Sequence, residues 1–543
     1  KAGIKSLTYN DPALKNRRQA YALVCETLKY KQVLEHILQS TGLHKAKVRP
    51  TLLLVLTYEL LFGRGKIQGG GKVKRIIMAK ASKLREALTR LKIRLGAQSS
   101  QDLLPESVRA VDRMPRYCRV NLIITTVEAV VKKLEDSGFE EVEASESAPE
   151  GKSFFRDRQV PGVLVFAPRT DLHDHLLVVS GALVLQDKSS CFPAHALSPS
   201  PTWDCIDACA APGNKTSHLI AIIHSRLANN ELAQDCSSIP APTVTAFERD
   251  AGRAKLLGRR LEKMGVCPNV KGAGGWKGKE WRGATDGGRV LVCVRKGSFL
   301  DAKPQDYPNV RAIVVDPTCS GSGMVGRVDH LLRETEPLFP ASSTSSTTYN
   351  GKNMGGKKRK RGVNPTSESS KEVVSKVESI AAFQKKIVSH ALSFPSVQIV
   401  AYSTCSIHNE ENEEVVRFAL KDNPDFRLKR ALPAWKRRGA EGMESCVRVD
   451  PIQDLTTGFF VALFERHRTS RTAVNKTSVT KTSQPLNHVV SRRNQISSSM
   501  SAKREVGDAK KLGAGGGTVC APSGGRGRKR RKKRPVRVKL MKF

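Results

Sequence analysis

Two short segments of this chain place a cysteine directly after an apolar, β-like run. Cys319 lies in the segment Asp316–Gly323, and Cys405 lies in the segment Ser403–Ser406. A single cysteine is usually a small buried hydrophobe. Two cysteines at the ends of two strands, with an aspartate in the first segment, indicate a chemical site.

A turn of small residues precedes an expected helix earlier in the chain. An apolar strand ends at Asp207, and the turn then runs Cys209-Ala210-Ala211-Pro212-Gly213-Asn214-Lys215. Small residues let a ligand approach the backbone at the carboxyl edge of a parallel sheet, where doubly wound folds bind cofactors. The first glycine of a phosphate-binding Gly-x-x-x-x-Gly-Lys loop is missing, so the turn is not of that kind.

Glu248 follows the next expected strand, Val244–Phe247. A carboxylate at this point can accept hydrogen bonds from both hydroxyls of an adenosine ribose. Glu248 alone would be interpreted as a surface residue in a loop. In this order of elements the ribose interpretation is favoured.

The elements that carry these residues alternate between strand and helix. We expect strands at Trp203–Asp207, Val244–Phe247, Arg311–Asp316, Val397–Tyr402 and Gly458–Phe464, and helices at Lys215–Leu227, Ala251–Met264, Val373–Leu392 and Glu410–Leu420. This alternation predicts an α/β fold with a doubly wound sheet.

Two further units precede this sheet. The first hundred residues predict helices with basic polar faces at Ala13–Leu28, Val33–Leu38, Thr51–Phe62 and Lys72–Leu95. They form either a solvated bundle or a bundle that grips RNA. The next hundred predict a small α+β unit with a strand at Arg116–Asn121, a helix at Thr125–Leu134 and a strand at Gly162–Ala167. Its basic residues beside an aromatic predict a surface for backbone and stacking contacts with RNA.

The composition limits the class of partner. The 543 residues include 92 Lys and Arg against 51 Asp and Glu, a net charge of +41. Such an excess favours a polyanion, either nucleic acid or an acidic membrane surface, over a merely soluble basic protein. No apolar run reaches the roughly 18 residues of a membrane span. The 12 cysteines form no short disulfide framework, which suits a reducing compartment, and without a Cys-x-x-Cys pair no zinc site is expected.

The domain organisation follows from these patterns. We expect a helical domain at 1–100, an α+β domain at 101–200, a catalytic domain at 201–467 and a basic tail at 468–543. The catalytic domain carries insertions near 268–298 and 340–372, where the segments Gly272–Gly288 and Ala341–Ser370 predict disorder. The tail contains seven consecutive cations, Arg528–Arg534, which cannot pack. A solvated tail and a nuclear-targeting or phosphate-binding tail are compatible interpretations.

The chain closely resembles the NOL/Sun (Nop/Sun) family of RNA cytosine-5 methyltransferases, and in particular its fifth subfamily, which acts on 25S/28S ribosomal RNA. The resemblance runs from about Tyr21 to Glu465. Shared segments are Leu185–Cys191, Cys209–Thr216, Asp316–Gly323, Tyr402–Ser406, Glu410–Glu413, Leu432–Trp435 and Gly458–Ala462. The paired Thr-Cys and Asp-Pro-x-Cys motifs are highly specific, because DNA cytosine methyltransferases use one catalytic cysteine in a Pro-Cys motif.

The resemblance implies a Rossmann-like class I methyltransferase domain and a role for each residue of the site. Cys405 would be the covalent nucleophile, Asp316 would bond or protonate the ring nitrogen, and Cys319 would assist product release. The S-adenosylmethionine pocket would comprise Cys209, Ala210, Ala211, Pro212, Gly213, Asn214, Lys215, Glu248, Arg253 and Asp316. The family often has proline where Thr318 stands. It has an acidic residue, which would face the adenine, where Ser298 stands.

The resemblance also implies a substrate and a compartment. A cytosine must leave its stack to reach a cysteine, so we expect a single-stranded or splayed-out base. Free ribosomal RNA and a pre-ribosomal particle are both compatible substrates, and we expect a monomer in the nucleus and nucleolus. One alternative is a non-catalytic RNA-binding ribosome-assembly factor that kept the fold. A methyltransferase for protein or small molecules would need no Cys405 and would not explain the net charge of +41.

Overall fold

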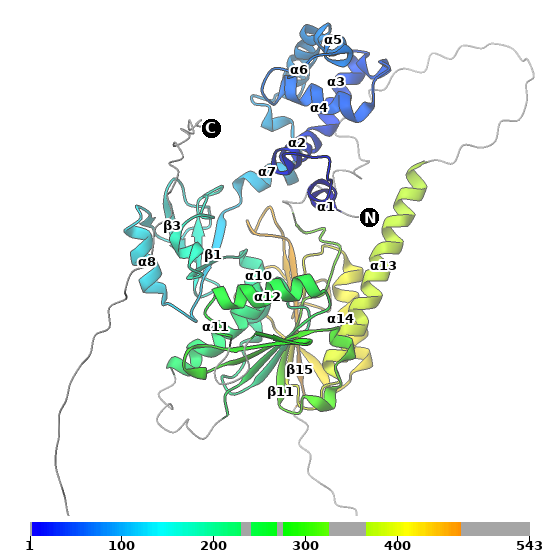
Figure 1. The fold of residues 1–543 in the computed structure, drawn as a ribbon. Helices are drawn as coiled ribbons and strands as arrows, with labels where there is room; N and C mark the ends of the chain where they lie inside the picture. Colours follow the sequence, from blue (N-terminus) through cyan, green and yellow to red (C-terminus); the bar gives the residue numbers. More distant parts are fainter. Residues whose placement is uncertain (1–2, 230–239, 269–274, 325–364, 468–543) are drawn as a thin grey trace, which may run out of the picture. The chain divides into compact units, whose positions relative to one another are not determined.

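The computed structural model describes residues 3–229, 240–268, 275–324 and 365–467 of the chain (Figure 1). Most of the second expected insertion, residues 341–364, lies outside the described residues, as does the expected basic tail. Among the helices that are described, none is long and apolar enough to cross a membrane.

Seven helices are described before residue 114, and they surround two small apolar cores. They are α1 (Ile4–Tyr9), α2 (Arg17–Lys29), α3 (Lys31–Ser40), α4 (Pro50–Leu61), α5 (Lys72–Met78), α6 (Ala81–Leu95) and α7 (Glu106–Arg113). The prediction of one continuous helix over Lys72–Leu95 is wrong. The backbone leaves helical geometry at Lys80, with φ −110° and ψ 11°, where the Lys80 ammonium donates to the Thr41 carbonyl at 2.9 Å. The helix is interrupted at this contact, between α5 and α6, and the apolar spacing of the sequence did not indicate the interruption.

The expected α+β unit contains a five-stranded sheet in the order β2-β3-β4-β1-β5. Its elements are β1 (Arg116–Val120), α8 (Val127–Glu135), β2 (Glu140–Glu141), β3 (Ser153–Arg156), β4 (Val163–Phe166), α9 (Leu176–Val179) and β5 (Leu183–Leu185). The Thr126 hydroxyl caps α8 by accepting from the Ala129 amide at 3.2 Å. Val130, Val131 and Leu134 of α8 are buried with side chains of the sheet.

The β1 strand does not present the stacking surface that its sequence predicted. Tyr117 is 7% exposed and Arg119 is 1% exposed. The Tyr117 hydroxyl donates to the Leu455 carbonyl at 3.0 Å, and the Arg119 guanidinium donates to the Ser217 hydroxyl at 2.8 Å. Both side chains therefore join the small sheet to elements around the large sheet, the helix that contains Ser217 and the loop that contains Leu455, and neither is available to a base.

The large sheet has ten strands, and its centre is parallel, in the order β10-β7-β6-β11-β12. At one side β15 is antiparallel to β12, and β13 and β14 pair with β15. The strands are β6 (Asp204–Asp207), β7 (Thr243–Glu248), β8 (Gly275–Lys277), β9 (Glu280–Ala284), β10 (Leu291–Lys296), β11 (Val310–Val315), β12 (Ile399–Thr404), β13 (Phe426–Lys429), β14 (Val447–Val449) and β15 (Phe459–Arg466). The predicted doubly wound α/β sheet is confirmed.

Helices cover both faces of this sheet (Figure 1). The helices are α10 (Lys188–Leu197), α11 (Asn214–Asn229), α12 (Ala251–Lys263), α13 (Pro365–Leu392) and α14 (Glu413–Asp422). The first three share one apolar core with the inward side chains of the strands, and the last two share the other. Because the five central strands are parallel, their carboxyl ends meet at one edge, where β6, β7, β11 and β12 deliver the predicted site residues.

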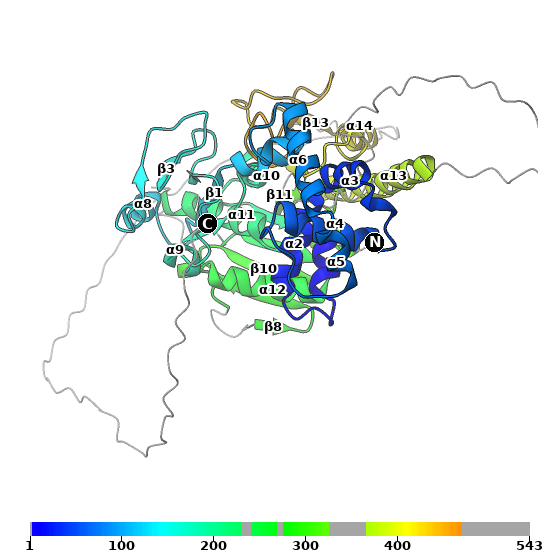
Figure 2. The ribbon, with the colours of Figure 1, turned by 90° about the horizontal axis from the view of Figure 1, so that it is seen from above.

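The prediction of disorder over Gly272–Gly288 is wrong from residue 275 onward. There β8 and β9 form an antiparallel hairpin that continues the sheet beyond β10, with β8 at its outer edge (Figure 2). Trp281 is 1% exposed, and its indole N–H donates to the Glu262 carboxylate on α12 at 3.0 Å. A Cβ on Gly283 would approach the Cys267 carbonyl to 2.7 Å, so close packing explains this glycine. The predicted disorder at Ala341–Ser370 is also wrong at its end, since α13 begins at Pro365.

Candidate active site

The two cysteines that the sequence singled out lie against each other. The sulfur atoms of Cys319 and Cys405 are 3.0 Å apart, although 86 positions separate them in the sequence. Cys319 follows β11 and Cys405 follows β12, which are adjacent parallel strands. The Gly323 amide donates to the Cys405 carbonyl at 3.0 Å and ties the two segments together.

Asp316 begins the first cysteine segment and is held from two sides. Its Oδ1 accepts from the Ser403 hydroxyl at 2.7 Å, and its Oδ2 lies 2.8 Å from the Lys215 ammonium. Lys215 also donates to the Ser190 hydroxyl at 3.2 Å. A carboxylate, an ammonium and two thiols thus meet at the carboxyl edge of β6, β11 and β12.

The electrostatics of this cluster act on the Cys319 thiol and on Lys215. The hydrogen bond to Cys405 raises the pKa of the Cys319 thiol far above its usual range, and burial and the nearby charges of Cys405 and Asp316 act in the same direction. Either thiol can be the donor in the 3.0 Å contact between the two sulfur atoms. Burial, the largest single cause, lowers the pKa of Lys215, but Asp316, Asp207 and Cys405 together outweigh it, so the pKa of Lys215 is raised. A fixed positive charge consequently lies beside the pair.

The predicted cofactor turn connects β6 to α11. The Ala210 amide donates to the Phe247 carbonyl at 2.9 Å, which seats the turn against the end of β7. Gly213 has φ +106°, and a Cβ there would approach a Leu257 methyl group to 2.7 Å. Only glycine suits both that backbone conformation and that space. Asp207 stabilises the turn by accepting from the Thr216 hydroxyl at 2.7 Å, and burial raises the pKa of Asp207 to about 6.

Glu248 lies at the end of β7 and is 7% exposed. One carboxylate oxygen accepts from the Asp250 amide at 2.8 Å, and the other lies 3.3 Å from the Arg253 guanidinium. Arg253 also donates to the Ala211 carbonyl at 2.6 Å, so it links the predicted ribose acceptor to the cofactor turn. The Ser298 hydroxyl, where the family has an acidic side chain, accepts from the Leu300 amide at 3.3 Å.

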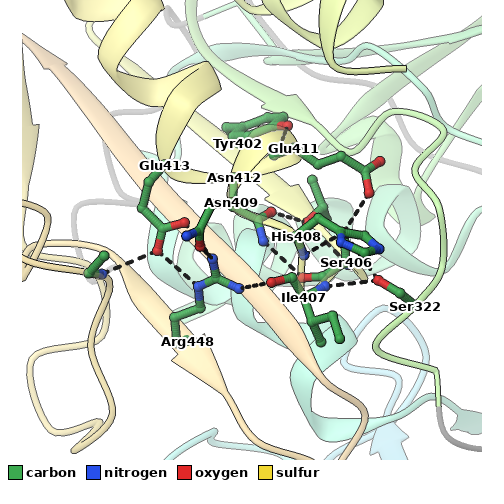
Figure 3. A network of polar contacts seen from close by, with 12 residues as sticks. Ser322, Tyr402, Ser406, Ile407, His408, Asn409, Glu411, Asn412, Glu413 and Arg448 are labelled. Atoms are coloured by element: carbon green, nitrogen blue, oxygen red, sulfur yellow. Dashed lines mark hydrogen bonds and ion pairs between the residues drawn. The ribbon is translucent and has the colours of Figure 1, made fainter. Parts of the chain in front are cut away.

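A polar network lies behind the second cysteine segment, around the start of α14 (Figure 3). Its centre is Glu411, which is fully buried and accepts from the Ser406 hydroxyl at 2.5 Å. The sequence placed Glu411 only within a shared segment and gave it no role. Ser190 and Ser403 were likewise not singled out. No metal-binding spacing was expected, and among the described residues no three His, Cys, Asp or Glu side chains gather into a possible metal site.

Three family models match the chain. The N-terminal domain of NOL1/NOP2/Sun domain family member 5 matches residues 18–104, and the ferredoxin-like domain of the same family member matches residues 114–186. The 16S rRNA methyltransferase RsmB/F model matches residues 364–465. The 28S rRNA (cytosine-C(5))-methyltransferase of Mus musculus is 35% identical over 518 residues, which cover 92% of this chain and 95% of the mouse protein. The chain belongs to the fifth subfamily of the NOL1/NOP2/Sun family.

Other comparisons agree with this membership. The 25S rRNA (cytosine-C(5))-methyltransferase of Arabidopsis thaliana, also of the NOL1/NOP2/Sun family, is 33% identical and covers 86% of this chain and 69% of its own length. The crystal structure of PH0851 has a TM-score of 0.51 at 17% identity, covering 85% of this chain and 93% of that chain. At that identity the likeness concerns the fold alone. The resemblance inferred from the motifs is confirmed, and the chain is a methyltransferase of this NOL1/NOP2/Sun subfamily.

Proposed function

We propose that this protein methylates ring carbon 5 of a cytosine in large-subunit ribosomal RNA by covalent catalysis at Cys405. The observation that carries the proposal is the 3.0 Å approach of the Cys319 and Cys405 sulfur atoms beside Asp316. Its similar relatives in mouse and Arabidopsis thaliana are named as 28S and 25S rRNA (cytosine-C(5))-methyltransferases. The net charge of +41 suits an RNA substrate.

The nucleophile is assigned to Cys405 by resemblance to the family, and the Cys319 sulfur lies 3.0 Å from the Cys405 sulfur. A hydrogen bond from the Cys319 thiol stabilises negative charge on the Cys405 sulfur, and the Lys215 ammonium adds a positive charge to the same cluster. The thiolate adds to the ring carbon next to carbon 5, and carbon 5 becomes nucleophilic. The transient adduct divides a difficult substitution into easier steps.

Asp316 is assigned to the ring nitrogen. Addition of the thiolate develops negative charge on the ring, and a proton delivered to the ring nitrogen stabilises that charge. The Lys215 ammonium, which is bonded to Asp316, can supply this proton through the Asp316 carboxylate. Ser403 and Lys215 hold the Asp316 carboxylate from two sides, so its position is set before substrate arrives. Cys319 then assists proton removal from carbon 5, and the bond from Cys405 to the ring breaks.

The residues at this edge fit S-adenosylmethionine. The turn from Cys209 to Gly213 brings only small side chains to the strand ends, and Glu248 offers carboxylate oxygens to a ribose. The carboxylates of Glu248 and Asp316 suit a ligand with a positive sulfonium. When bound, this cofactor supplies the activated methyl group, and the protein supplies position and electrostatics. Asn214, Lys215 and Arg253 would complete the pocket.

The site of action follows from the substrate. Ribosomal RNA is made in the nucleolus, and we propose that the protein works there as a monomer on rRNA or a pre-ribosomal particle. A non-catalytic assembly factor on the same fold would have no need for the assembled cluster of Cys319, Cys405 and Asp316.

The direct test is bisulfite sequencing of ribosomal RNA from cells with and without the protein. One large-subunit cytosine should lose its protection from conversion when the protein is removed, and the wild-type gene should restore that protection. The Cys405→Ala variant should not restore it. If every large-subunit cytosine that is protected in cells with the protein stays protected in cells without it, the proposed substrate is refuted.

A further inference from the structure

Glu411 is a buried carboxylate that binds both cysteine segments at once. Its Oε1 accepts from the Ser320 amide at 2.9 Å, and its Oε2 accepts from the Ser406 hydroxyl at 2.5 Å. Ser320 directly follows Cys319, and Ser406 directly follows Cys405. One side chain therefore joins the two segments within one residue of each cysteine.

A second side chain holds Cys319 from its other side. The Gln384 amide on α13 donates to Glu411 Oε1 at 3.1 Å and to the Thr318 carbonyl at 3.2 Å. Thr318 directly precedes Cys319, so the peptide groups on both sides of this cysteine are bonded to the cluster around Glu411. Gln384 and Glu411 are both fully buried. Water cannot replace these hydrogen bonds, and bonds to a carboxylate are the strong kind.

Glu411 and its neighbour Asn412 are hydrogen-bonded to residues of β12. The Glu411 backbone carbonyl accepts from the Tyr402 hydroxyl at 2.5 Å. The side-chain amide of the neighbouring Asn412 donates to the Ser406 carbonyl at 2.9 Å (Figure 3). The Asn412 side chain also accepts from the Thr404 hydroxyl at 2.5 Å. The carboxylate therefore has little freedom to follow either cysteine segment if that segment moves.

We propose that Glu411 is a positioning residue that sets the spacing between Cys319 and Cys405. It does not touch the reacting atoms. It acts through Ser320 and Ser406, and it keeps the Cys319 thiol within hydrogen-bonding distance of the Cys405 sulfur. The inference rests on the proposed roles of the two cysteines, but the spacing itself can be measured without RNA or cofactor.

The matched control is Glu413, two positions further along. It is also fully buried, but it points to the other side of the network and is bound by Arg448 (Figure 3). Arg448 in turn donates to the Ile407 carbonyl at 2.9 Å. Glu411→Gln and Glu413→Gln therefore make the same chemical change at equal burial. Only the first replaces one of the two oxygens that accept from the cysteine segments by an amide nitrogen, which donates.

The first measurement is thiol crosslinking of the full chain with dibromobimane, which becomes strongly fluorescent when both arms alkylate thiols. Mass spectrometry assigns the Cys319–Cys405 crosslink, and Cys319→Ala and Cys405→Ala give the background. Glu411→Gln should lower the yield of that crosslink severalfold, whereas Glu413→Gln should leave it near wild type. Equal yields in wild type and Glu411→Gln, or equal losses in both Gln variants, would overturn the proposal.

The second measurement separates positioning from general stability. Because Cys319 is assigned to product release, Glu411→Gln should accumulate an RNA–protein adduct as Cys319→Ala does. A catalytic group that is displaced from its working position commonly slows its step strongly. Displacement of the Cys319 thiol should therefore slow product release about tenfold or more, while the KM for the RNA substrate stays near wild type. Ser406→Ala removes one hydrogen-bond donor to Glu411 and changes the side-chain volume little, so it should show the same pattern more weakly. It replaces Glu411→Gln in the experiment if that variant does not fold.

The two hypotheses fail in different ways. If Glu411→Gln lowers the Cys319–Cys405 crosslink and Glu413→Gln does not, but the wild-type protein never methylates RNA, the proposed function fails and the positioning role stands. If wild-type protein methylates RNA while Glu411→Gln and Ser406→Ala match it in crosslinking and adduct level, the positioning role fails alone.

Discussion

A close contact between two thiols distinguishes the residues of this candidate active site. The Cys319 thiol faces the Cys405 sulfur at 3.0 Å, and the same contact raises the pKa of Cys319. The proposed roles of the two cysteines differ, and the Lys215–Asp316 ion pair places opposite charges beside both thiols.

Substitution of each cysteine should separate these roles. Cys405→Ala should abolish methylation and also abolish trapping by a fluorinated or aza-substituted cytosine, because no covalent bond to the ring can form. Cys319→Ala should instead accumulate the RNA–protein adduct, because release stalls. Denaturing gel electrophoresis of labelled RNA measures the adduct. Equal adduct levels in wild type and Cys319→Ala would contradict the division of roles.

Glu248 should contribute mainly to cofactor affinity. In Glu248→Ala two hydrogen bonds to ribose hydroxyls are lost, and a hydrogen bond to a charged group contributes roughly 1.5–3 kcal/mol. We therefore expect S-adenosylmethionine affinity to fall about tenfold or more, as measured by isothermal titration calorimetry. Arg253 loses its ion-pair partner in this variant, so Arg253→Ala serves as the control for that contact. Unchanged affinity in Glu248→Ala would refute the ribose assignment.

At the scale of elements, the β8–β9 hairpin extends the sheet beyond β10, which pairs with β7. Its Gly- and Lys-rich sequence shows no periodicity, yet β9 pairs with β10 along five positions. The order comes from Trp281, whose ring packs in the core shared with α12 and whose N–H reaches Glu262. A single large side chain thus offsets the weak strand preference of its neighbours.

Trp281→Ala should consequently destabilise the catalytic domain. Loss of a fully buried tryptophan costs about 3–5 kcal/mol through lost burial and the remaining cavity. Urea denaturation of the full chain, followed by circular dichroism, measures the change in the free energy of unfolding. Trp276→Ala is a useful comparison, because Trp276 is only partly buried and should cost less. A loss below about 1 kcal/mol in Trp281→Ala would show that the hairpin is not anchored as described.

At the scale of the whole molecule, the net charge of +41 directs the protein toward a polyanion. Seven consecutive cations, Arg528–Arg534, lie in the chain beyond the catalytic sheet. Such a run attracts phosphate by releasing counterions, and that attraction weakens steeply with salt. The residues of the catalytic cluster, in contrast, all lie on the described α/β sheet.

Removal of residues 468–543 should therefore flatten the salt dependence of RNA binding and shift the protein out of the nucleolus. The rate of chemistry on bound substrate should stay nearly intact. Filter binding at several salt concentrations, imaging of the truncated protein and single-turnover methylation at saturating enzyme check the three parts. A large fall in the single-turnover rate would show that the tail takes part in the active site.

The sequence by itself determined the alternation of strands and helices, the strand ends and the cysteines at them. These features are local, because apolar spacing and small-residue turns depend on neighbours a few positions away. The same local motifs predicted that Cys319 and Cys405 share a sheet edge. Parallel strands bring the residues after their carboxyl ends to one edge, whatever the length of chain between the strands.

Only the tertiary structure decided the features that depend on contacts between distant segments. It divided the expected helix Lys72–Leu95, ordered the hairpin around Trp281 and buried Tyr117 and Arg119 away from any base. It also brought Glu411 between the two cysteine segments. No local pattern distinguishes a glutamate that faces water from one that binds two loops, because that difference arises from burial and from hydrogen-bond partners supplied by other elements.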